Sequence, residues 1–558
     1  MGGDNLLNKA WYIGNTTLRN PRRLKEGLNI YQQSDLHGNL TGKENETKLA
    51  ILLHNSLTVY IKRLDDDQDA DVSDMGRKWR AALMQLGFIK HRESDEPFKI
   101  TANGQRLIKS NSLAQENECF LRSLLAQQVP SVIESFSSEQ IFNPLRVVLQ
   151  VLKKLEESGL EPVISIDEMA TYVQRTGQQH IDETIKLIED YRKNIGISEN
   201  KEKYKNEIRE AVSSYCVNQA ASTLKDYADT NFRYLKLTGL FVENSRRLRI
   251  ADHKKKLVDA ILSTKFIPLS DEAYPSVFWE GSALPTDNSI IALEEIRQLQ
   301  ELLKSFDVDT SSDGVDVDSV IELSRLRLEL EDELFRQYEL MYAKRQFDEY
   351  KDIVAYMNAL QNPRQKGSMI PGGEAPAYLE WIIWRAFLSI NSLVNKPWEA
   401  RRFRIDENFK PINTAPGGGP DIIFEFEDYV FIVEVTLTMS SRQEAAEGEP
   451  VRRHVASYVD HYERLGKIVY GIFIANQIDT NTAETFRIGS WYRNDESKMS
   501  LKIVPLTLEQ FTLFYEKMFL SGKEVSPDRV YQLLIYCLAE SNSEAPTWKR
   551  RIDLIAKR

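Results

Sequence analysis

The segment from Pro420 to Thr436 constrains the fold more than any other, because its pattern predicts a β-hairpin. If the chain reverses at the Glu-Asp pair in the middle of this segment, Phe424 faces Phe431 and Asp421 faces Glu434. One face of the hairpin is then apolar, and the other carries two opposed carboxylates whose Cβ atoms lie about 4.5–5.5 Å apart. Carboxylates at this separation can share a hard cation such as Mg²⁺, which relieves their mutual repulsion. The hairpin therefore predicts a metal site suited to cleaving phosphodiesters.

A second interpretation of the two carboxylates is a solvated strand end with acidic side chains. Glu434 lies within the apolar run 431–437, where a buried carboxylate without a partner costs several kcal/mol. This context favours a compensating group such as a metal ion.

Other acidic and basic residues complete a wider pattern around the hairpin. Glu380 precedes it in Tyr378-Leu-Glu-Trp-Ile-Ile-Trp384, and Glu447-Gly-Glu-Pro-Val-Arg-Arg-His454 follows it. Together with Pro420-Asp421 and Glu434-Val435-Thr436, these motifs resemble the PD-(D/E)XK nuclease core. More narrowly, they resemble the AlwI family of type IIS restriction endonucleases and site-specific nickases. Thr436 stands where the general core has a lysine, and AlwI-type enzymes share that departure. The segment 11–23 is also similar to the opening of that family, so the resemblance covers nearly the whole chain.

The resemblance and the hairpin together imply a set of catalytic residues. Asp421 and Glu434, with the carbonyl of Val435, are expected to hold Mg²⁺, which polarises the scissile phosphate and activates water. Glu380 and Glu447 would complete the acidic site, and Arg453 or His454 would stabilise developing charge. The nearby Glu444 and Glu449 remain alternatives to Glu447.

Length and charge limit the class of protein. A chain of 558 residues with 42% hydrophobic residues is expected to form several domains. The net charge of -11 argues against DNA binding by bulk charge, so any nucleic-acid contact must come from local basic surface. Cys119, Cys216 and Cys537 lack metal-ligand spacing and are expected to be buried thiols. The sequence has no apolar signal segment and no run of 18 apolar residues, so secretion and membrane insertion are unsupported. The family resemblance implies a cytoplasmic prokaryotic protein.

Two stretches of the N-terminal half predict winged helices. Residues 73–109 and 222–262 each read helix, strand, turn, strand, helix. In such a unit the helix can enter the major groove of DNA and the ribbon can follow the backbone, although winged helices also dock proteins. The basic side chains expected to contact DNA are Arg77, Lys78 and Arg80 in the first unit and Arg233, Lys236, Arg246 and Arg247 in the second. For each of them the alternative is a solvated charge.

A third group of candidate DNA contacts lies near the N-terminus. It comprises Asn15, Thr16, Thr17, Arg19, Arg22 and Arg23. Such side chains can contact bases or phosphates. The competing interpretation is an irregular segment packed by Trp11 and Tyr12.

These patterns predict a multidomain α+β protein. We expect an N-terminal recognition subdomain at 1–150 and a second at 151–282, each with one winged helix, then a helical linker at 283–373 and an α/β PD-(D/E)XK domain of the restriction-endonuclease type at 374–558. The last domain is predicted to be a mixed sheet with helices on both faces. Its expected elements are helix 376–394, strands near 402–409, 421–427 and 429–438, helix 450–465, strands 467–475 and 501–506, and helix 507–521.

The expected function is a type IIS restriction endonuclease that binds a short asymmetric duplex site and cuts at a fixed offset. We expect the chain to be monomeric when free and to dimerise transiently for double-strand cleavage, and the resemblance implies a cognate DNA methyltransferase that protects the host. Two alternatives stay open: a strand-specific nickase of the same family, and a non-catalytic winged-helix regulator that lost activity through Thr436.

Overall fold

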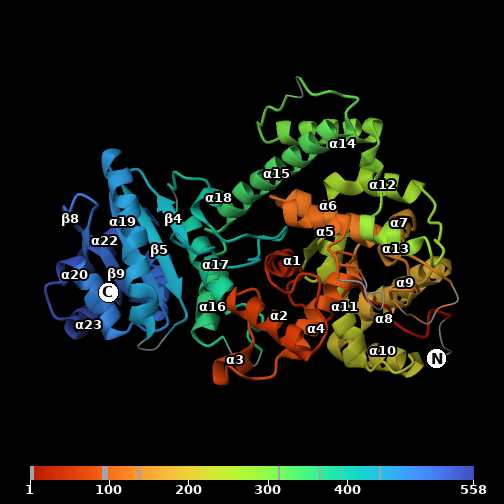
Figure 1. The fold of residues 1–558 in the computed structure, drawn as a ribbon, viewed down its shortest axis with the longest axis horizontal. Helices are drawn as coiled ribbons and strands as arrows, with labels where there is room; N and C mark the ends of the chain where they lie inside the picture. The colour runs from red at the N-terminus through yellow and green to blue at the C-terminus, as the bar shows by residue number, and fades with distance from the viewer. Residues whose placement is uncertain are drawn as a thin grey trace. The chain divides into compact units, whose positions relative to one another are not determined.

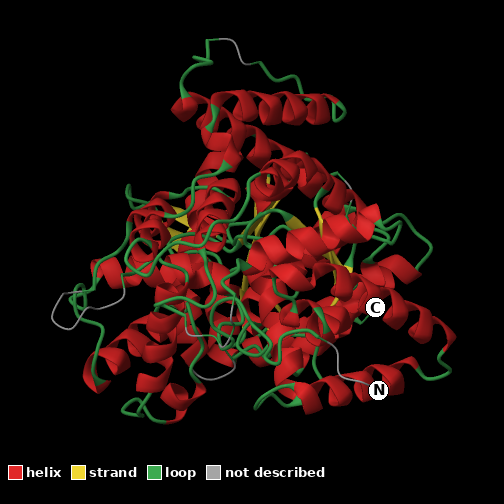
Figure 2. Cartoon of the chain, turned by 90° about the vertical axis from the view of Figure 1, so that its right-hand side faces the viewer, coloured by secondary structure: helices red, strands yellow, loops and turns green. Residues whose placement is uncertain are grey.

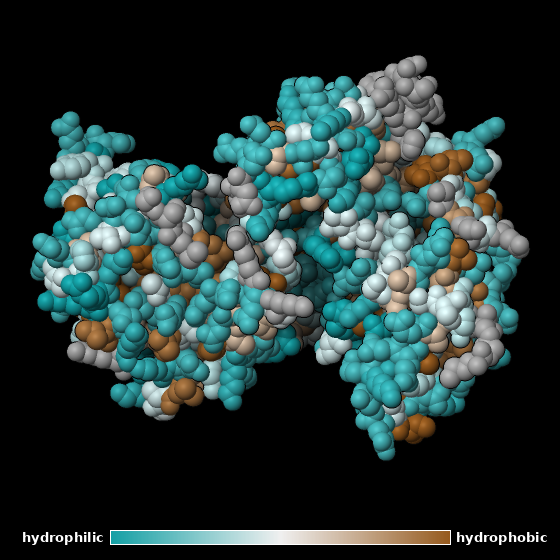
Figure 3. Space-filling model, turned by 90° about the horizontal axis from the view of Figure 1, so that it is seen from below, coloured by the Kyte–Doolittle hydropathy of each residue, from teal (hydrophilic) through white to brown (hydrophobic). Residues whose placement is uncertain are grey.

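The chain folds into two compact units, Met1–Phe335 and Arg336–Arg558, in the computed structural model shown in Figure 1. The structure describes residues 5–90, 98–134, 136, 138, 140–311, 314–363, 365, 367–390, 392–438 and 442–557. Helices dominate both units, and the strands lie among them (Figure 2). On the face seen in Figure 3, hydrophilic side chains prevail and the hydrophobic ones form small separate patches. Among the described residues, no helix has the length and apolar character needed to cross a membrane.

The first unit is mainly helical with one small sheet. Its α-helices are α1 (Leu24–Gln33), α2 (Lys43–Asn55), α3 (Lys62–Asp66), α4 (Ser73–Gln85), α5 (Ala102–Lys109), α6 (Leu113–Ala126), α7 (Pro144–Glu157), α8 (Ile166–Thr171), α9 (Ile181–Ile197), α10 (Lys201–Tyr215), α11 (Ala221–Lys236), α12 (Lys255–Ser263), α13 (Tyr274–Glu280), α14 (Ser289–Lys304) and the first part of α15 (Val320–Arg345). Short 3₁₀ turns are η1 (Pro21–Arg23), η2 (Val173–Arg175), η3 (Gln178–His180), η4 (Asp252–Lys254) and η5 (Pro285–Asp287). The strands β1 (Ile164–Ser165), β2 (Phe241–Asn244) and β3 (Arg247–Ile250) form an antiparallel sheet in the order β1-β3-β2.

One hydrophobic core, from Leu6 to Leu284, runs through the first unit and includes residues of both predicted recognition subdomains. The N-terminal segment contributes to it, since Trp11 is buried and its backbone N–H donates to the Gln174 carbonyl at 2.8 Å. The three cysteines are free and buried, as predicted.

The second predicted winged-helix region has the expected order of elements. Helix α11 is followed by Gly239, whose φ of +70° suits a helix C-terminus, and then by the β2–β3 hairpin and α12. Ser245 and Arg246 form the hairpin turn with positive φ values of 51° and 59°.

The first region differs from its prediction in the ribbon. Helices α4 and α5 lie where the sequence predicts them, but the strands shrink to an isolated antiparallel bridge between Ile89 and Ile100. The turn of this ribbon, 91–97, lies outside the described residues.

The helices predicted for the linker are confirmed, but they pack within the two units. In the first unit, buried Arg327 of α15 pairs with Glu118 and Glu331, and Lys254 lies 2.6 Å from Glu331. Such buried charges are stable only when paired. The four-domain division stays a prediction.

The second unit is built on a mixed sheet of the order β4-β5-β6-β9. Its strands are β4 (Ile422–Glu425), β5 (Tyr429–Thr436), β6 (Ile468–Ala475), β7 (Ser490–Tyr492), β8 (Lys498–Ser500) and β9 (Ile503–Thr507). Its helices are the end of α15, α16 (Tyr350–Gln361), α17 (Ala375–Leu388), α18 (Pro397–Ala400), the π-helical turn η6 (Glu444–Gly448), α19 (Glu449–Arg464), α20 (Thr480–Ile488), α21 (Leu508–Leu520), α22 (Pro527–Ala539) and α23 (Ala545–Ala556).

Helices cover both faces of this sheet, as predicted. Strands β4 and β5 are antiparallel, whereas β5, β6 and β9 run parallel. On one face Phe387 of α17 stacks on Phe424 at a centroid distance of 4.2 Å. On the other face α19 packs against β5 and β6. Because β5 is covered on both sides, six of its residues from Tyr429 to Glu434 are buried.

One predicted strand is wrong. The stretch 402–409 makes only isolated bridges, Arg401 with Ile422 and Ile405 with Pro411. The chain turns back on itself at Asp406–Lys410 through a hydrogen bond from the Asp406 N–H to the Lys410 carbonyl, so no continuous ladder forms. The helix predicted at 376–394 ends earlier, at Leu388.

Candidate active site

The β4–β5 hairpin has the predicted register. Phe424 pairs with Phe431, and Ile422 pairs with Val433, which places Asp421 and Glu434 opposite each other at the next step. The Val435 N–H donates a hydrogen bond of 2.9 Å to Asp421 Oδ2, so the two strands are joined at the carboxylates as well. The alternation of apolar side chains in a strand fixes this register, since a slip of one residue would turn the apolar face outward.

Burial and mutual repulsion raise the pKa values of the two opposed carboxyl groups. Burial raises the pKa of Glu434 to about 8, with repulsion from Glu447 acting in the same direction and hydrogen bonds from Asp421 opposing it. The pKa of Asp421 is also raised well above its ordinary value, first by burial and then by the charge of Glu434. Two such groups cannot both ionise cheaply without a nearby positive charge.

His454 is the closest side-chain partner of Glu434. Its Nδ1 lies 2.6 Å from Glu434 Oε1, and helix α19 brings it there across the sheet face. Its Nε2 is buried and has no hydrogen-bond partner among the described residues. Burial, and then the positive charge of Arg453, lower the pKa of His454, which favours a neutral imidazole. The site therefore contains a buried ring nitrogen whose hydrogen-bonding capacity no described residue uses.

Glu380 reaches the same place from helix α17. It is 5% exposed, and its Oε2 accepts a hydrogen bond of 2.7 Å from the Ala415 N–H. Burial first, and then the charge of Asp421, raise its pKa well above the ordinary value. On the opposite face of α17, buried Arg385 pairs with Glu349 and Asp352 of the α16 region, each at 2.7 Å, and this anchors the helix.

Of the three acidic candidates after the hairpin, Glu447 is the one whose charge acts on the opposed carboxylates. It lies in the π-helical turn η6, and its charge acts on Asp421 and Glu434. Its own pKa is raised by burial, while a hydrogen bond with the side chain of Thr436 opposes the rise. Glu444 instead accepts from the Thr485 hydroxyl at 3.2 Å, and Glu449 is exposed. The turn thus brings Glu447 and Thr436 together.

Arg453 is not brought into this cluster. It is exposed and pairs with Glu449 one helical turn away, at 3.0 Å. The sequence did not point to Arg402, whose charge acts on Glu380, Glu434 and His454. The signal for it was the Gly417-Gly-Gly-Pro420 run, which lets a side chain approach the backbone before Asp421.

The residues fit a magnesium ion better than a metal that needs many protein ligands. Within the described part of the chain, no group of three His, Cys, Asp or Glu side chains could by itself hold a metal ion. Mg²⁺ commonly takes only one or two carboxylates and completes its shell with water and substrate phosphate. Asp421 and Glu434 supply that pair, and their raised pKa values indicate a need for positive charge.

The predicted DNA-contacting residues of the first unit separate by burial. Arg22 and Arg23 are 3% and 6% exposed; Arg22 donates to Asn117 at 2.9 Å and Arg23 to the Thr58 carbonyl at 3.0 Å. They hold the N-terminal segment in place and do not lie on the surface. Arg80 is also engaged internally, with the Leu40 carbonyl at 2.8 Å.

Three other arginines gather around Asp229 of α11. Arg233 lies 3.1 Å, Arg246 3.6 Å and Arg19 3.8 Å from this carboxylate. The side chains of Arg19 and Arg246 are 62% and 58% exposed. The N-terminal segment is tied to the same place, since the Thr16 and Leu18 carbonyls accept from Arg233 and the Asn15 N–H donates to the Tyr234 hydroxyl at 3.0 Å. Three positive charges with one negative charge leave a basic patch, which we name the Asp229 cluster.

The remaining predicted contacts lie outside the Asp229 cluster. Arg77 is exposed, Lys78 lies 3.3 Å from Asp74, Lys236 lies 2.6 Å from Glu243, Arg247 pairs with Glu161, and Thr17 donates its N–H to Asn15 at 3.0 Å. Each side chain that is already paired must give up that partner before it can bind a phosphate.

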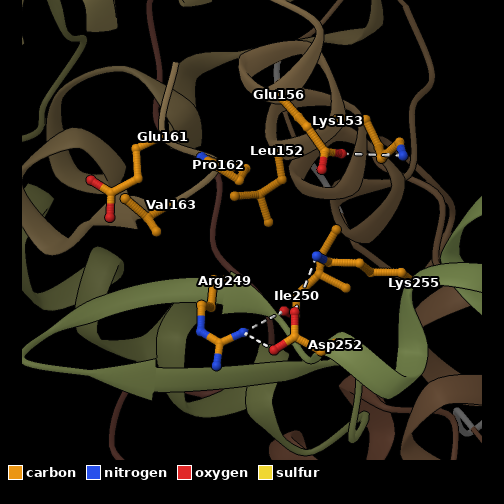
Figure 4. Close-up of a pocket in the computed structure, with 10 residues that line it drawn as sticks. All are labelled: Leu152, Lys153, Glu156, Glu161, Pro162, Val163, Arg249, Ile250, Asp252 and Lys255. Carbon is orange, nitrogen blue, oxygen red and sulfur yellow. Dashed lines mark hydrogen bonds and ion pairs between the residues drawn. The ribbon is translucent and has the colours of Figure 1, made fainter. Parts of the chain in front are cut away.

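A cavity of about 290 Å³ in the first unit is not the chemical site (Figure 4). Its charged side chains pair with one another: Asp252 with Arg249 at 3.0 Å and with Lys255 at 3.1 Å, and Lys153 with Glu156 at 3.3 Å. None of the carboxylates of the β4–β5 hairpin lines it.

Residues 84–514 match the model of the AlwI restriction endonuclease family. This match, over a chain whose second unit presents opposed carboxylates at a sheet edge, defines a restriction nuclease, an enzyme that cleaves DNA. The chain belongs to the AlwI restriction endonuclease family. No match is found among curated proteins.

Several solved structures are similar to parts of the chain. The small subunit of the heterodimeric restriction endonuclease R.BspD6I is 25% identical and covers 37% of this chain and 97% of its own, with a TM-score of 0.29. The BpuJ1 endonuclease binding domain, in complex with pyrene- and phenanthrene-modified DNA, is 11% identical over 59% of this chain and 97% of its own, with a TM-score of 0.31. The restriction endonuclease FokI is 14% identical over 95% of this chain and 99% of its own, with a TM-score of 0.24.

Proposed function

We propose that the chain is a type IIS restriction endonuclease that binds a short asymmetric DNA site and hydrolyses phosphodiesters with Mg²⁺ at a fixed distance from it. The observation that carries this proposal is the opposition of Asp421 and the buried Glu434 in a chain of the AlwI family. The second unit then corresponds to a PD-(D/E)XK nuclease domain, and the first to a recognition region with tandem winged helices. The direct test is to incubate the protein with Mg²⁺ and a plasmid of known sequence and to map the ends on both strands.

The side chains of the site have separate tasks in this mechanism. Asp421 and Glu434, with the Val435 carbonyl, would hold Mg²⁺, and the Val435 N–H keeps Asp421 oriented. When bound, Mg²⁺ supplies Lewis-acid polarisation of the phosphate and lowers the pKa of water. Glu380 and Glu447 hold water at the edge of the acidic cluster.

His454 takes part through its second ring nitrogen. With Nδ1 directed at Glu434, Nε2 is left to accept a proton from the attacking water or to donate one to developing charge. Its neutral form at physiological pH, favoured by the lowered pKa, suits proton acceptance. Thr436 cannot take over the positive charge of the usual lysine, so this role must fall to other residues.

DNA recognition is proposed to lie mainly in the first unit. The Asp229 cluster places Arg19 and Arg246 on the surface beside α11 and the β2–β3 turn, where a winged helix meets the DNA backbone. We also propose that the protein acts in the host cytoplasm and that a cognate methyltransferase protects the host DNA.

Removing Arg19 and Arg246 together is expected to weaken DNA binding mainly through lost phosphate contacts. The slope of log K against log salt should become less steep by roughly 2, since each contact contributes about 0.9. The measurement is a gel-shift titration at several salt concentrations with Arg19→Ala/Arg246→Ala. Arg325→Ala, exposed on α15, is the matched control. An unchanged salt slope in the double variant would move the DNA surface elsewhere.

The metal-free protein is expected to lose stability as the pH rises. The folded pKa of Glu434, about 8, lies above its unfolded value of about 4.3, so its contribution is complete below about pH 4.3 and is lost as the pH rises through about 8. Mg²⁺ replaces the proton on Glu434. The rise in Tm caused by Mg²⁺ should therefore be larger at pH 8 than at pH 6, because less of the carboxyl group has to release a proton. Thermal unfolding with and without Mg²⁺ measures both effects.

Glu434→Gln is expected to flatten both pH dependences, and Glu427→Gln, in the exposed hairpin turn, should leave them unchanged. Equal Mg²⁺ stabilisation in Glu434→Gln and wild type would contradict a metal at this carboxylate.

Two alternatives make different predictions in the plasmid test. A strand-specific nickase gives nicked circles and no linear DNA at any protein concentration. A non-catalytic regulator binds a specific duplex and leaves the plasmid intact, as expected if Thr436 had removed activity.

A further inference from the structure

Arg402 is placed beside the acidic site by the main chain itself. Its N–H donates to the Asp421 carbonyl at 3.3 Å, and the neighbouring Arg401 bridges Ile422. The side chain of Arg402 therefore starts at the same edge of the sheet as the Asp421 carboxylate.

The guanidinium group of Arg402 is held by the glycine-rich loop before Asp421. Its Nη1 donates to the Pro420 carbonyl at 3.1 Å, and its Nη2 lies 3.5 Å from the Gly417 carbonyl. A Cβ atom at Gly419 would lie 2.5 Å from Nη1, so only glycine leaves room for the guanidinium in this position. The loop thus fixes where the positive charge lies.

This positive charge has no carboxylate of its own in the described part of the chain. The neighbouring Arg401 pairs with Glu339 at 2.8 Å, and Arg453 pairs with Glu449. Arg402 is bound only by backbone carbonyls, which use two of the five N–H donors of a guanidinium. Its charge nevertheless acts on Glu380 and Glu434.

We propose that Arg402 binds the non-bridging oxygens of the phosphate at the cleavage position. The inference rests on the proposed function and names one further catalytic residue for it. A phosphodiester is an anion and would be repelled by the carboxylates of Glu380, Asp421, Glu434 and Glu447. Arginine can meet two phosphate oxygens with its planar fork, and a guanidinium fixed by Gly419 needs little reorganisation to do so.

The contact is stronger in the transition state than in the bound substrate. The oxygen of water forms the new P–O bond, and the leaving ester oxygen takes the electron pair of the broken bond and a proton. Negative charge on the non-bridging oxygens is stabilised by donors that already point at it. Arg402 supplies part of the positive charge that the usual lysine would bring and Thr436 cannot.

The test compares substitutions of the side chain with substitutions of the loop in the full-length protein. Arg402→Met is expected to lower the single-turnover cleavage rate about 10²–10³-fold, as for loss of one fixed oxyanion donor. Arg402→Lys should lose about tenfold, because it keeps the charge and loses the fork. Gly419→Ala keeps the arginine but displaces it, and should also lose about tenfold. Gly372→Ala, in another loop of the second unit, is the matched control, since a Cβ there meets open space.

A DNA substrate with one non-bridging oxygen of the scissile phosphate replaced by sulfur tests whether Arg402 contacts the phosphate or has only a structural role. One phosphorothioate diastereomer should slow the wild type in Mg²⁺ and should cause no additional slowing in Arg402→Met. Specific DNA binding in the gel shift should stay within a few-fold for every variant. If Arg402→Met unfolds at a lower temperature, the comparison of Gly419→Ala with Gly372→Ala decides the question.

The outcomes separate this inference from the proposed function. Wild-type cleavage in Arg402→Met, or equal rates for Gly419→Ala and Gly372→Ala, overturns the role of Arg402 alone. Absence of Mg²⁺-dependent cutting by the wild type overturns the proposed function. Loss of cutting in Arg402→Met with the same sulfur effect as in the wild type assigns Arg402 a structural role and also overturns the inference.

Discussion

Asp421→Asn and Glu434→Gln are expected to lower the cleavage rate about 10³-fold or more while site-specific DNA binding stays within a few-fold of wild type. A metal ion bound at the two carboxylates would supply several kcal/mol of charge stabilisation, and each 1.4 kcal/mol is about tenfold in rate. Binding should survive because the proposed DNA contacts lie in the first unit. Cleavage and gel-shift assays on one duplex, each at saturating protein, separate the two effects.

The substitutions keep the size of the side chains, so the fold should be preserved. Since the carboxyl groups have raised pKa values, the amides should unfold at the same temperature as the metal-free wild type or at a higher one. Glu444→Gln, which changes an acidic residue bonded to Thr485, is the matched control and should cut normally. Mg²⁺-dependent cutting at wild-type rates by both amide variants would show that the hairpin does not hold the metal.

Mixing wild-type and Asp421→Asn chains is expected to convert linear product into nicked product. The β4–β5 hairpin supplies one pair of opposed carboxylates, and one such pair attacks one strand in a given orientation. Double-strand cleavage is therefore expected to need a second chain. In an equal mixture about a quarter of random pairs hold two active sites and about half hold one.

The measurement is the ratio of linear to nicked plasmid with one recognition site, followed over protein concentration. Linearisation should rise cooperatively with wild-type protein and fall in the mixture while nicking increases. Efficient double-strand cutting by chains that stay monomeric on DNA would contradict the two-chain scheme. Nicking alone at every concentration would favour the nickase.

The Asp229 cluster illustrates where sequence patterns reach their limit. The sequence pointed to Arg19, Arg233 and Arg246 in separate groups, and the packing of the N-terminal segment on α11 brings them to one carboxylate. The sequence pointed equally to Arg22 and Arg23, but these two side chains are buried. Nothing in residue type or spacing separates these two outcomes, because a buried arginine with internal partners and an exposed one have the same local pattern.

The four strands of the main sheet in the second unit, and three of its helices, followed from local pattern. Apolar runs of β-branched and aromatic residues predicted β5 and β6, and periodicity predicted α19 and α21 within a few residues. The stretch 402–409 failed because its alternation is short and the chain is turned by the hydrogen bond between Asp406 and Lys410. The small elements α20, β7 and β8 and the two C-terminal helices α22 and α23 were not predicted.

The sequence by itself determined the opposition of Asp421 and Glu434, because hairpin register depends on residues that lie close together along the chain. Only the tertiary structure decided which side chains meet them. Glu380 accepts a hydrogen bond from Ala415, 35 positions away. His454 contacts Glu434 from α19, and the guanidinium of Arg402 lies against Gly419. Such contacts depend on how helices pack on the two faces of the sheet. That packing is a property of the whole buried core, and no local spacing encodes it.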